Sequence, residues 1–216
     1  MLIRKEKTKS LITMKRKDII ILITRKLPEK IEKKLKENFN VILNRTDKKL
    51  SYSELKKKIS EVDILVPCVS DTIDASIIKS GKKLKLIANF GNGVDNLDLV
   101  TAREENVVVT NTPDVLTEDT ADLVLTLVLM ISRKVVEAQK KISGGSWSGW
   151  GPSETMGERI TGKNFGIIGM GRIGKAVAKR LDILGVQIFY HNRNRLKKNE
   201  EKILKVKYFE NLDLMI

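Results

Sequence analysis

The sequence has very few of the residues on which metal binding and histidine chemistry depend. Its 216 residues include one cysteine, Cys68, and one histidine, His191. A single cysteine excludes an intrachain disulfide, and no cysteine and histidine cluster with the spacing of a zinc site is present. A chain of this length can bury roughly 70% of its unfolded surface, so its core needs no disulfide or metal. We therefore expect no metal site.

Long apolar runs are also lacking. The best apolar helix candidate, Leu123–Ile131, has about half the length that a bilayer requires, and Asp122 lies at its edge. The basic residues at the start of the chain lack the apolar segment of a secretory signal. These features predict a cytoplasmic protein with no membrane partner.

Aromatic residues make up only 5% of the chain, although its formal net charge is +14. Proteins that bind nucleic acids favour arginine for reading base edges and aromatic rings for stacking. Here 30 lysines outnumber 11 arginines and are spread over the whole chain. We therefore interpret the charge as a lysine-rich surface and expect no nucleic-acid partner; a steep salt dependence of DNA binding would indicate the opposite.

Short apolar runs alternate with amphipathic stretches in the first half of the chain. Such alternation with short loops predicts an α/β domain built on a parallel sheet. One helix is expected after Pro28, one after the capping-box pair Ser51 and Glu54, and one over Asp98–Glu105. The strands are expected at Ile19–Ile23, Val41–Leu43, Ile64–Val66, Leu84–Ala88 and Val107–Thr110.

A long helix over Thr117–Lys141 is expected next, because acidic residues open it and lysines close it, as the helix dipole favours. The Gly/Ser-rich loop Ser143–Gly151 then breaks the pattern. A second α/β region begins at Lys163, and the last residues, Asn211–Ile216, resemble the opening of a helix. Its strands are expected at Phe165–Ile168, Val186–Tyr190 and Val206–Phe209.

The strongest chemical signal is the motif G-x-G-x-x-G, which spans Gly169–Gly174 between a predicted strand and an amphipathic helix. Gly169 would allow a sharp turn, Gly171 a close approach of backbone to a pyrophosphate, and Gly174 close packing of the helix on the sheet. The helix start would direct N–H groups at the phosphates. The alternative is a tight turn without a ligand. The residues predicted to bind the cofactor here are Gly169, Gly171, Arg172, Ile173 and Gly174.

The end of the following strand indicates which dinucleotide binds. NAD sites usually place an acid there to accept a hydrogen bond from the ribose 2′-OH. This chain has Asn192 instead, followed by Arg193 and Arg195. An acid would repel a 2′-phosphate, whereas a guanidinium binds it with two hydrogen bonds. We therefore expect a preference for NADP(H), with NAD(H) possible; alternatively, the arginines are only exposed turn charges.

Several segments resemble the D-isomer-specific 2-hydroxyacid dehydrogenases, in the order and spacing of that family from about Lys17 to Ile216. The sequence HNR that begins at His191, together with the Gly-Trp loop, is most similar to the glyoxylate/hydroxypyruvate reductase branch. The segments that carry the resemblance are Leu86–Asp98, Val109–Pro113, Val115–Asp122 and Gly169–Gly174.

The resemblance implies two domains: a flavodoxin-like substrate domain over residues 17–113 and an incomplete Rossmann domain, with a doubly wound parallel sheet, over residues 114–216. Residues 1–16 would form a basic extension, with Met14 as a second possible start. Backbone amides at Asn92 and Gly93 would bind the substrate carboxylate; alternatively, this loop only joins a strand to a helix. Family members often have glycine where this chain has Asp114.

The resemblance also implies that the catalytic Arg, Glu and His of the family would lie beyond residue 216. His191 would lie at the adenosine end of the site and could not protonate the carbonyl. We therefore expect a fragment of a homodimeric oxidoreductase for a small 2-oxo or 2-hydroxy acid, of the glyoxylate or hydroxypyruvate type, that is inactive as an isolated chain. The alternative is a non-catalytic dinucleotide-binding module that acts through a partner.

Overall fold

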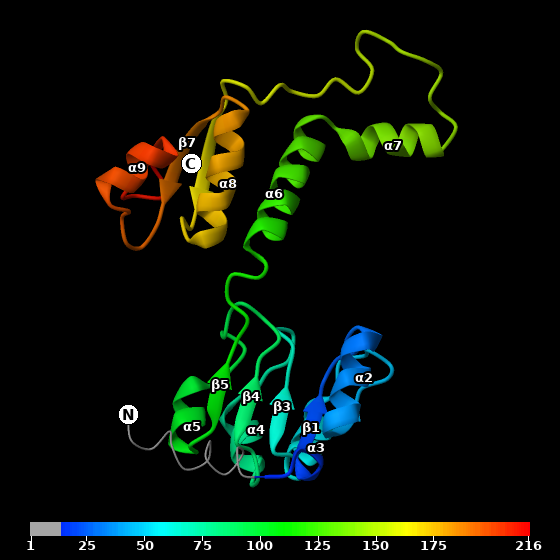
Figure 1. Ribbon diagram of the computed structural model, residues 1–216. Helices are drawn as coiled ribbons and strands as arrows, with labels where there is room; N and C mark the ends of the chain where they lie inside the picture. Colours follow the sequence, from blue (N-terminus) through cyan, green and yellow to red (C-terminus); the bar gives the residue numbers. More distant parts are fainter. Residues whose placement is uncertain (1–13) are drawn as a thin grey trace. The chain divides into compact units, whose positions relative to one another are not determined.

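The computed structural model of the chain describes residues 14–216 (Figure 1). Most of the basic extension predicted for residues 1–16 therefore lies outside the described residues. The chain divides into two compact units, and the boundary between them in the sequence lies between Pro113 and Asp114. A 3-10 helix, η1 (Arg16–Asp18), precedes the first strand.

The first unit is built on one parallel sheet with the strand order β2-β1-β3-β4-β5, which is the flavodoxin-like order. The predicted α/β class is therefore confirmed. The strands are β1 (Ile20–Ile23), β2 (Asn40–Leu43), β3 (Ile64–Val66), β4 (Leu86–Ala88) and β5 (Val108–Thr110). The helices are α2 (Glu29–Asn38), α3 (Tyr52–Ile59), α4 (Ala75–Ser80) and α5 (Leu99–Glu104).

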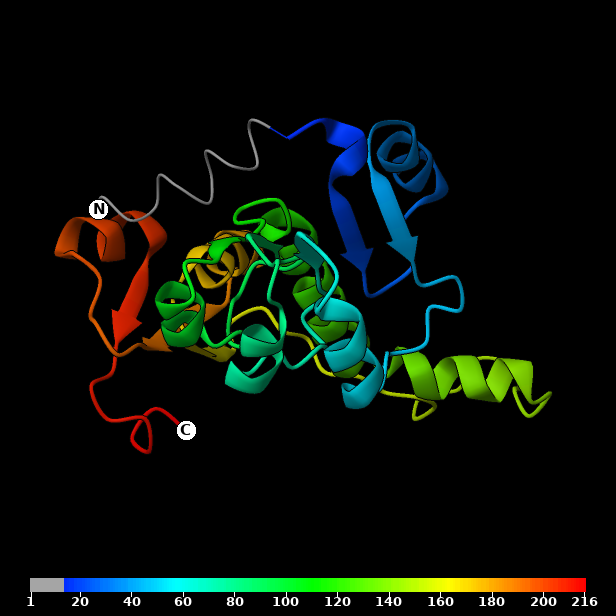
Figure 2. The ribbon, with the colours of Figure 1, turned by 90° about the horizontal axis from the view of Figure 1, so that it is seen from below.

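Both faces of the first sheet are buried. Successive side chains of a strand point to opposite sides, so β1 contributes to an apolar cluster on each face. Leu22 packs with Leu65 in one apolar cluster, whereas Ile21 and Ile23 belong to another. The dark blue helix α2 lies beside β1 and β2 and supplies Leu35 to the second cluster (Figure 2). The apolar run of β1 is thus explained by burial on both sides.

Capping residues fix the starts of three helices in the first unit, at Ser51, Asp74 and Asp98. The predicted capping box is confirmed, because Ser51 N donates to Glu54 Oε2 at 2.8 Å and Glu54 N donates to Ser51 Oγ at 3.3 Å. The short helix α4 is not evident in the apolar pattern of the sequence. Asp74 caps it by accepting a hydrogen bond from Ile77 N at 2.9 Å.

The second unit has a three-stranded parallel sheet with the order β6-β7-β8, which matches the first half of a Rossmann sheet. Helices α6 (Thr117–Ser132) and α8 (Arg172–Ile183) pack together in its core, where Ala121, Ala178, Leu181 and Tyr190 are buried. The strands are β6 (Asn164–Ile168), β7 (Gln187–His191) and β8 (Val206–Tyr208), and the helices of this sheet are α8 (Arg172–Ile183) and α9 (Lys198–Leu204).

The single long helix predicted over residues 117–141 is wrong. The chain forms two helices, α6 (Thr117–Ser132) and α7 (Val135–Ser143), which run in different directions (Figure 1). Lys134 has a φ of +52°, which ends the α6 conformation. Glu158 N donates to Ser132 O at 2.7 Å, and this segment occupies a carbonyl that a continuous helix would use.

The helix opening predicted at Asn211 is present as a single turn, in which Ile216 N donates to Leu212 O at 3.2 Å with the spacing of an α-helix. Residues 211–216 form turns, in which Met215 N donates to Leu212 O at 2.9 Å. The side chain of Asn211 accepts from Asp213 N at 2.9 Å, which is the contact that an N-cap residue makes with the second residue of a helix.

Candidate dinucleotide and substrate site

The glycine loop in the second unit connects the end of β6 to the start of α8. Gly169 has a φ of +97°, which favours glycine, and its N–H donates to His191 O at 2.9 Å. A Cβ added at Gly174 would lie only 2.3 Å from Gly169 O. The backbone of the helix therefore passes so close to the end of β6 that no other residue fits at Gly174.

Gly171 differs from the other two glycines, because the fold itself does not require it. A Cβ added there would meet no atom within 4 Å, and its φ is −78°. The space beside it is therefore open to a ligand that approaches the backbone. Helix α8 also begins at Gly171 with no side-chain cap, so the N–H groups of its first turn are available to an anion. These residues fit the pyrophosphate of a dinucleotide.

The side chain of Arg172 is engaged by Asp114, within the second unit. Arg172 Nε lies 2.9 Å from Asp114 Oδ1, and Arg172 Nη1 donates to Asp114 Oδ2 at 3.2 Å. Asp114 has a φ of +69°, the conformation that glycine adopts most readily. Because both side chains are exposed, this pair adds little stability, about 0–1 kcal/mol. Its effect is to hold the Arg172 side chain while the backbone of the loop stays open.

The residues predicted to read the ribose lie in the turn after β7. Asn192 Nδ2 donates to Asn194 O at 2.8 Å, which closes the turn. Arg193 is exposed, and its guanidinium makes no hydrogen bond or ion pair within residues 14–216. Arg195, by contrast, donates from Nε and Nη2 to the two carboxylate oxygens of Glu201, both at 2.8 Å. The two arginines therefore differ in their freedom to bind a phosphate.

Glu201 on α9 organises the base of this turn, a role that no sequence motif signals. It accepts from Arg195 and also from Tyr190 Oη at 2.7 Å. These hydrogen bonds, that of Arg195 above all, lower the pKa of Glu201 to about 2. Burial and the hydrogen bond to Glu201 raise the pKa of Tyr190 to about 12. The turn that carries Arg193 is thus held by a charged pair and a buried phenol.

His191 has a structural contact at the end of β7. Its Nδ1 lies 3.0 Å from Phe209 O, so the ring donates a hydrogen bond to that carbonyl. Its own carbonyl receives the N–H of Gly169. His191 therefore joins the glycine loop to the neighbouring strands.

The candidate substrate loop lies in the first unit, after β4. Gly91 lies against the exposed side chain of Val69, which an added Cβ would have to displace because it would lie 2.2 Å from Val69 Cγ1. Asn92 and Gly93 follow, and Asn92 O accepts from Asn111 Nδ2 at 2.8 Å. Asn92 Oδ1 is buried without a hydrogen-bond partner among the described residues, so the loop leaves one acceptor open for a donor such as an ordered water.

Residues 21–207 match the model of the D-isomer specific 2-hydroxyacid dehydrogenase, catalytic domain. The chain belongs to the D-isomer specific 2-hydroxyacid dehydrogenase family. It is therefore related to oxidoreductases that use nicotinamide dinucleotides and act on small 2-oxo or 2-hydroxy acids.

Two relatives and two solved structures of this family are similar to the chain. The glyoxylate reductases of Thermococcus litoralis and Thermococcus onnurineus are 39% and 38% identical to it over 187 residues, which is 85% of this chain and 56% of each relative. The TT0316 protein from Thermus thermophilus has a TM-score of 0.80 and 40% identity, covering 88% of this chain and 60% of that one. A glyoxylate reductase from Paecilomyes thermophila has a TM-score of 0.71 and 26% identity, with coverages of 88% and 60%. The chain thus spans little more than half the length of the curated relatives it matches.

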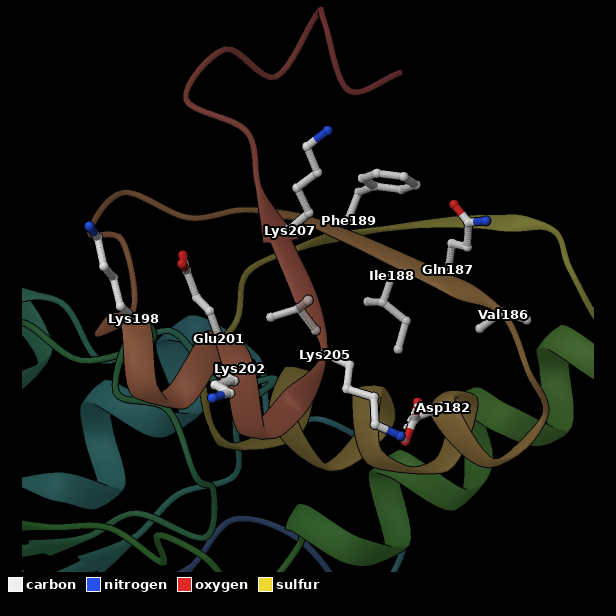
Figure 3. A pocket seen from close by; sticks show the side chains of 11 residues that line it. Asp182, Val186, Gln187, Ile188, Phe189, Lys198, Glu201, Lys202, Lys205 and Lys207 are labelled. Carbon is white, nitrogen blue, oxygen red and sulfur yellow. Dashed lines mark hydrogen bonds and ion pairs between the residues drawn. The ribbon is translucent and has the colours of Figure 1, made fainter.

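A pocket in the second unit has no residue of the glycine loop in its lining (Figure 3). It is lined from β7, β8, α9 and the end of α8, and Lys205 Nζ there lies 2.8 Å from Asp182 Oδ2. Its other acid, Glu201, is paired with Arg195. Because its acids are paired and its lysines are surface residues, we assign no ligand to it.

Within residues 14–216, no group of histidine, cysteine and acidic residues is arranged to hold a metal ion. In the same part of the chain, every helix is too short or too polar to cross a bilayer.

Proposed function

We propose that this chain carries the dinucleotide loop and the substrate-carboxylate loop of an NADP(H)-dependent reductase for small 2-oxo acids of the glyoxylate or hydroxypyruvate type. One observation carries the proposal: the open space at Gly171, at the uncapped start of α8, in a chain of this family. The names of the Thermococcus relatives support glyoxylate as the substrate class.

Each loop has a separate task in this proposal. Backbone N–H groups of Arg172, Ile173 and Gly174 bind the pyrophosphate, because the first turn of a helix offers unpaired donors to an anion. The nicotinamide, when bound, supplies the hydride that reduces the 2-oxo group. Backbone amides at Asn92 and Gly93 hold the substrate carboxylate, so that its 2-oxo carbon has a fixed orientation.

The preference for NADP(H) rests on the turn after β7. Asn192 adds no negative charge where a 2′-phosphate would lie, and Arg193 has a free guanidinium for two hydrogen bonds. Arg195 already donates hydrogen bonds from two of its nitrogens to Glu201. It would offer the phosphate hydrogen bonds from its third nitrogen, together with its positive charge. NAD(H) lacks this phosphate and is expected to bind more weakly.

Two further points follow from the family resemblance. A polypeptide of these 216 residues is expected to bind NADPH. A second copy of the chain is the expected partner, because α6 exposes an apolar stripe at Leu123, Leu127 and Ile131. Sedimentation equilibrium is expected to give twice the mass of the chain.

The function is tested by NADPH titration of the 216-residue chain and of the Gly171→Val variant, followed by NADPH fluorescence. The new side chain enters open space, so the thermal unfolding of the variant is expected to match the parent. It would also fill the approach to the backbone, so NADPH affinity is expected to fall at least tenfold, about 1.4 kcal/mol. Equal affinity of parent and variant would show that no pyrophosphate lies at Gly171.

A further inference from the structure

The peptide bonds of the substrate loop are held from their carbonyl side by two asparagine side chains. Asn111 Nδ2 donates to Asn92 O at 2.8 Å, and Asn89 Nδ2 donates to Gly93 O at 2.9 Å. Asn89 directly follows β4 and Asn111 directly follows β5, and these strands are neighbours in the sheet. Two adjacent peptide planes are therefore fixed from the ends of adjacent strands.

Fixing these carbonyls also fixes the N–H groups of the same peptides. A trans peptide is planar, and its N–H points opposite to its C=O; none of the described peptide bonds is cis. The N–H of Gly93 therefore points away from Asn111, and the N–H of Val94 points away from Asn89. Within residues 14–216, neither N–H donates to a protein acceptor. Successive N–H groups without a protein acceptor are the donors from which an anion-binding site is built.

The donor Asn89 is itself held in place by Asn96. The two side chains exchange hydrogen bonds, Asn89 Nδ2 to Asn96 Oδ1 at 3.3 Å and Asn96 Nδ2 to Asn89 Oδ1 at 3.2 Å. Asn96 Nδ2 also lies 3.2 Å from both Cys68 O and Asp71 O, so its two hydrogens are shared among three acceptors. Asn89 is only 2% exposed. A buried and satisfied amide of this kind resists rotation of the peptide that it holds.

We propose that Asn89 and Asn111 are positioning residues: Asn111 orients the N–H of Gly93, and Asn89 orients the N–H of Val94, which joins the amides at Asn92 and Gly93 as a third donor to the carboxylate. This inference rests on the proposed function, because it takes the carboxylate of a 2-oxo acid as the ligand. The two asparagines do not touch the substrate. They act through the backbone carbonyls of Asn92 and Gly93. Because the asparagines hold these carbonyls away from the anion, the N–H groups of the same peptides face it.

The test uses the full chain labelled with ¹⁵N and oxalate as the probe, because oxalate carries a carboxylate beside a second carbonyl carbon. The variant is Asn111→Leu, which removes the donor without adding charge; Asn111 is exposed, so the fold is expected to persist. The matched control is Asn40→Leu, the same change at an exposed residue where β2 begins, at the opposite edge of the sheet. The amide resonances of Gly93 and Val94 report the site directly.

In the parent and the control, oxalate is expected to shift the Gly93 and Val94 resonances with the same dissociation constant. In Asn111→Leu, the Gly93 resonance is expected to move before any oxalate is added, and oxalate to bind about tenfold more weakly, which is the worth of one hydrogen bond. If Asn111→Leu binds oxalate like the parent, the positioning role is wrong and the substrate loop stands. If oxalate leaves both amides of the parent unshifted, the substrate loop and the positioning role are both wrong.

Discussion

The loops after β4 and β6 both expose backbone N–H groups at the carboxyl end of a parallel strand, yet they are built by different means. The loop after β4 is shaped by side-chain amides, those of Asn89 and Asn111, that hold its carbonyls. The loop after β6 is shaped by missing side chains, because Gly174 lies against Gly169 with no room for a Cβ. The shape of the loop after β4 therefore depends on side-chain hydrogen bonds, whereas the shape of the loop after β6 depends on a glycine that has no Cβ.

This difference decides what a substitution does to each loop. Loss of an amide such as that of Asn111 removes one hydrogen bond, and the loop can relax around it. A side chain added at Gly174 meets backbone atoms that cannot move aside without displacing β6 or α8. The glycine loop is therefore expected to tolerate change less well than the asparagine loop, except at Gly171, where the space is open.

The largest effect is expected from Gly174→Val. The added Cβ would lie 2.3 Å from Gly169 O, so the second unit should lose about 3 kcal/mol of stability, at the upper end of the cost of overpacking. Urea unfolding monitored by amide resonances of the second unit measures this loss. Gly171→Val is the matched control and should lie within about 0.5 kcal/mol of the parent. Equal losses in the two variants would contradict the distinction between the two glycines.

The contrast between the loops also explains what the sequence could predict. The spacing of Gly169, Gly171 and Gly174 is visible in the sequence because each glycine answers a local steric demand. The contact of Asn111 with Asn92 O forms only when β4 and β5 are aligned, so no short motif signals it. Glu201 was missed for the same reason, since its partner Tyr190 lies on another element.

The elements themselves were largely predictable, because buried strands appear as apolar runs and caps as short local patterns. The prediction of one continuous helix across α6 and α7 failed for a specific reason. The amphipathic pattern continues through Arg133 and Lys134, but Glu158, far along the chain, takes the carbonyl of Ser132. A tertiary contact therefore overrides a helix signal that is locally consistent.

A smaller effect, on cofactor affinity, is expected from Arg193→Ala. This variant tests the charge of the turn after β7 and not the shape of a loop. If the free guanidinium of Arg193 binds the 2′-phosphate, NADPH affinity should fall about tenfold, while NADH affinity stays the same. Isothermal titration with both cofactors measures the ratio. Arg133→Ala removes an arginine outside the glycine loop and the β7 turn and is the control for net charge. An unchanged NADPH to NADH ratio in Arg193→Ala would show that the arginine is only a surface charge.

The smallest effect is a change of stability with pH. It distinguishes the two regions because one is held by neutral side chains and the other by a carboxylate. The carbonyls of the loop after β4 are held by neutral amides, whereas the turn after β7 is held by Glu201, whose pKa is lowered to about 2. A carboxyl with a lowered pKa stabilises the folded state fully above its unfolded pKa, about 4.3, and loses this contribution as the pH falls towards 2. The stability of the second unit should therefore decline across this window.

Glu201→Gln tests the assignment, because glutamine keeps the shape but does not titrate. At pH 7 the variant should be less stable than the parent, since Arg195 loses its charged partner. As the pH falls from about 4.3 to about 2, the difference between parent and variant should shrink, because the parent's carboxyl becomes neutral too. Urea midpoints measured at several pH values, followed separately by resonances of each unit, report the change. A constant difference across the window would mean that Glu201 does not carry the acid sensitivity of the turn that presents Arg193.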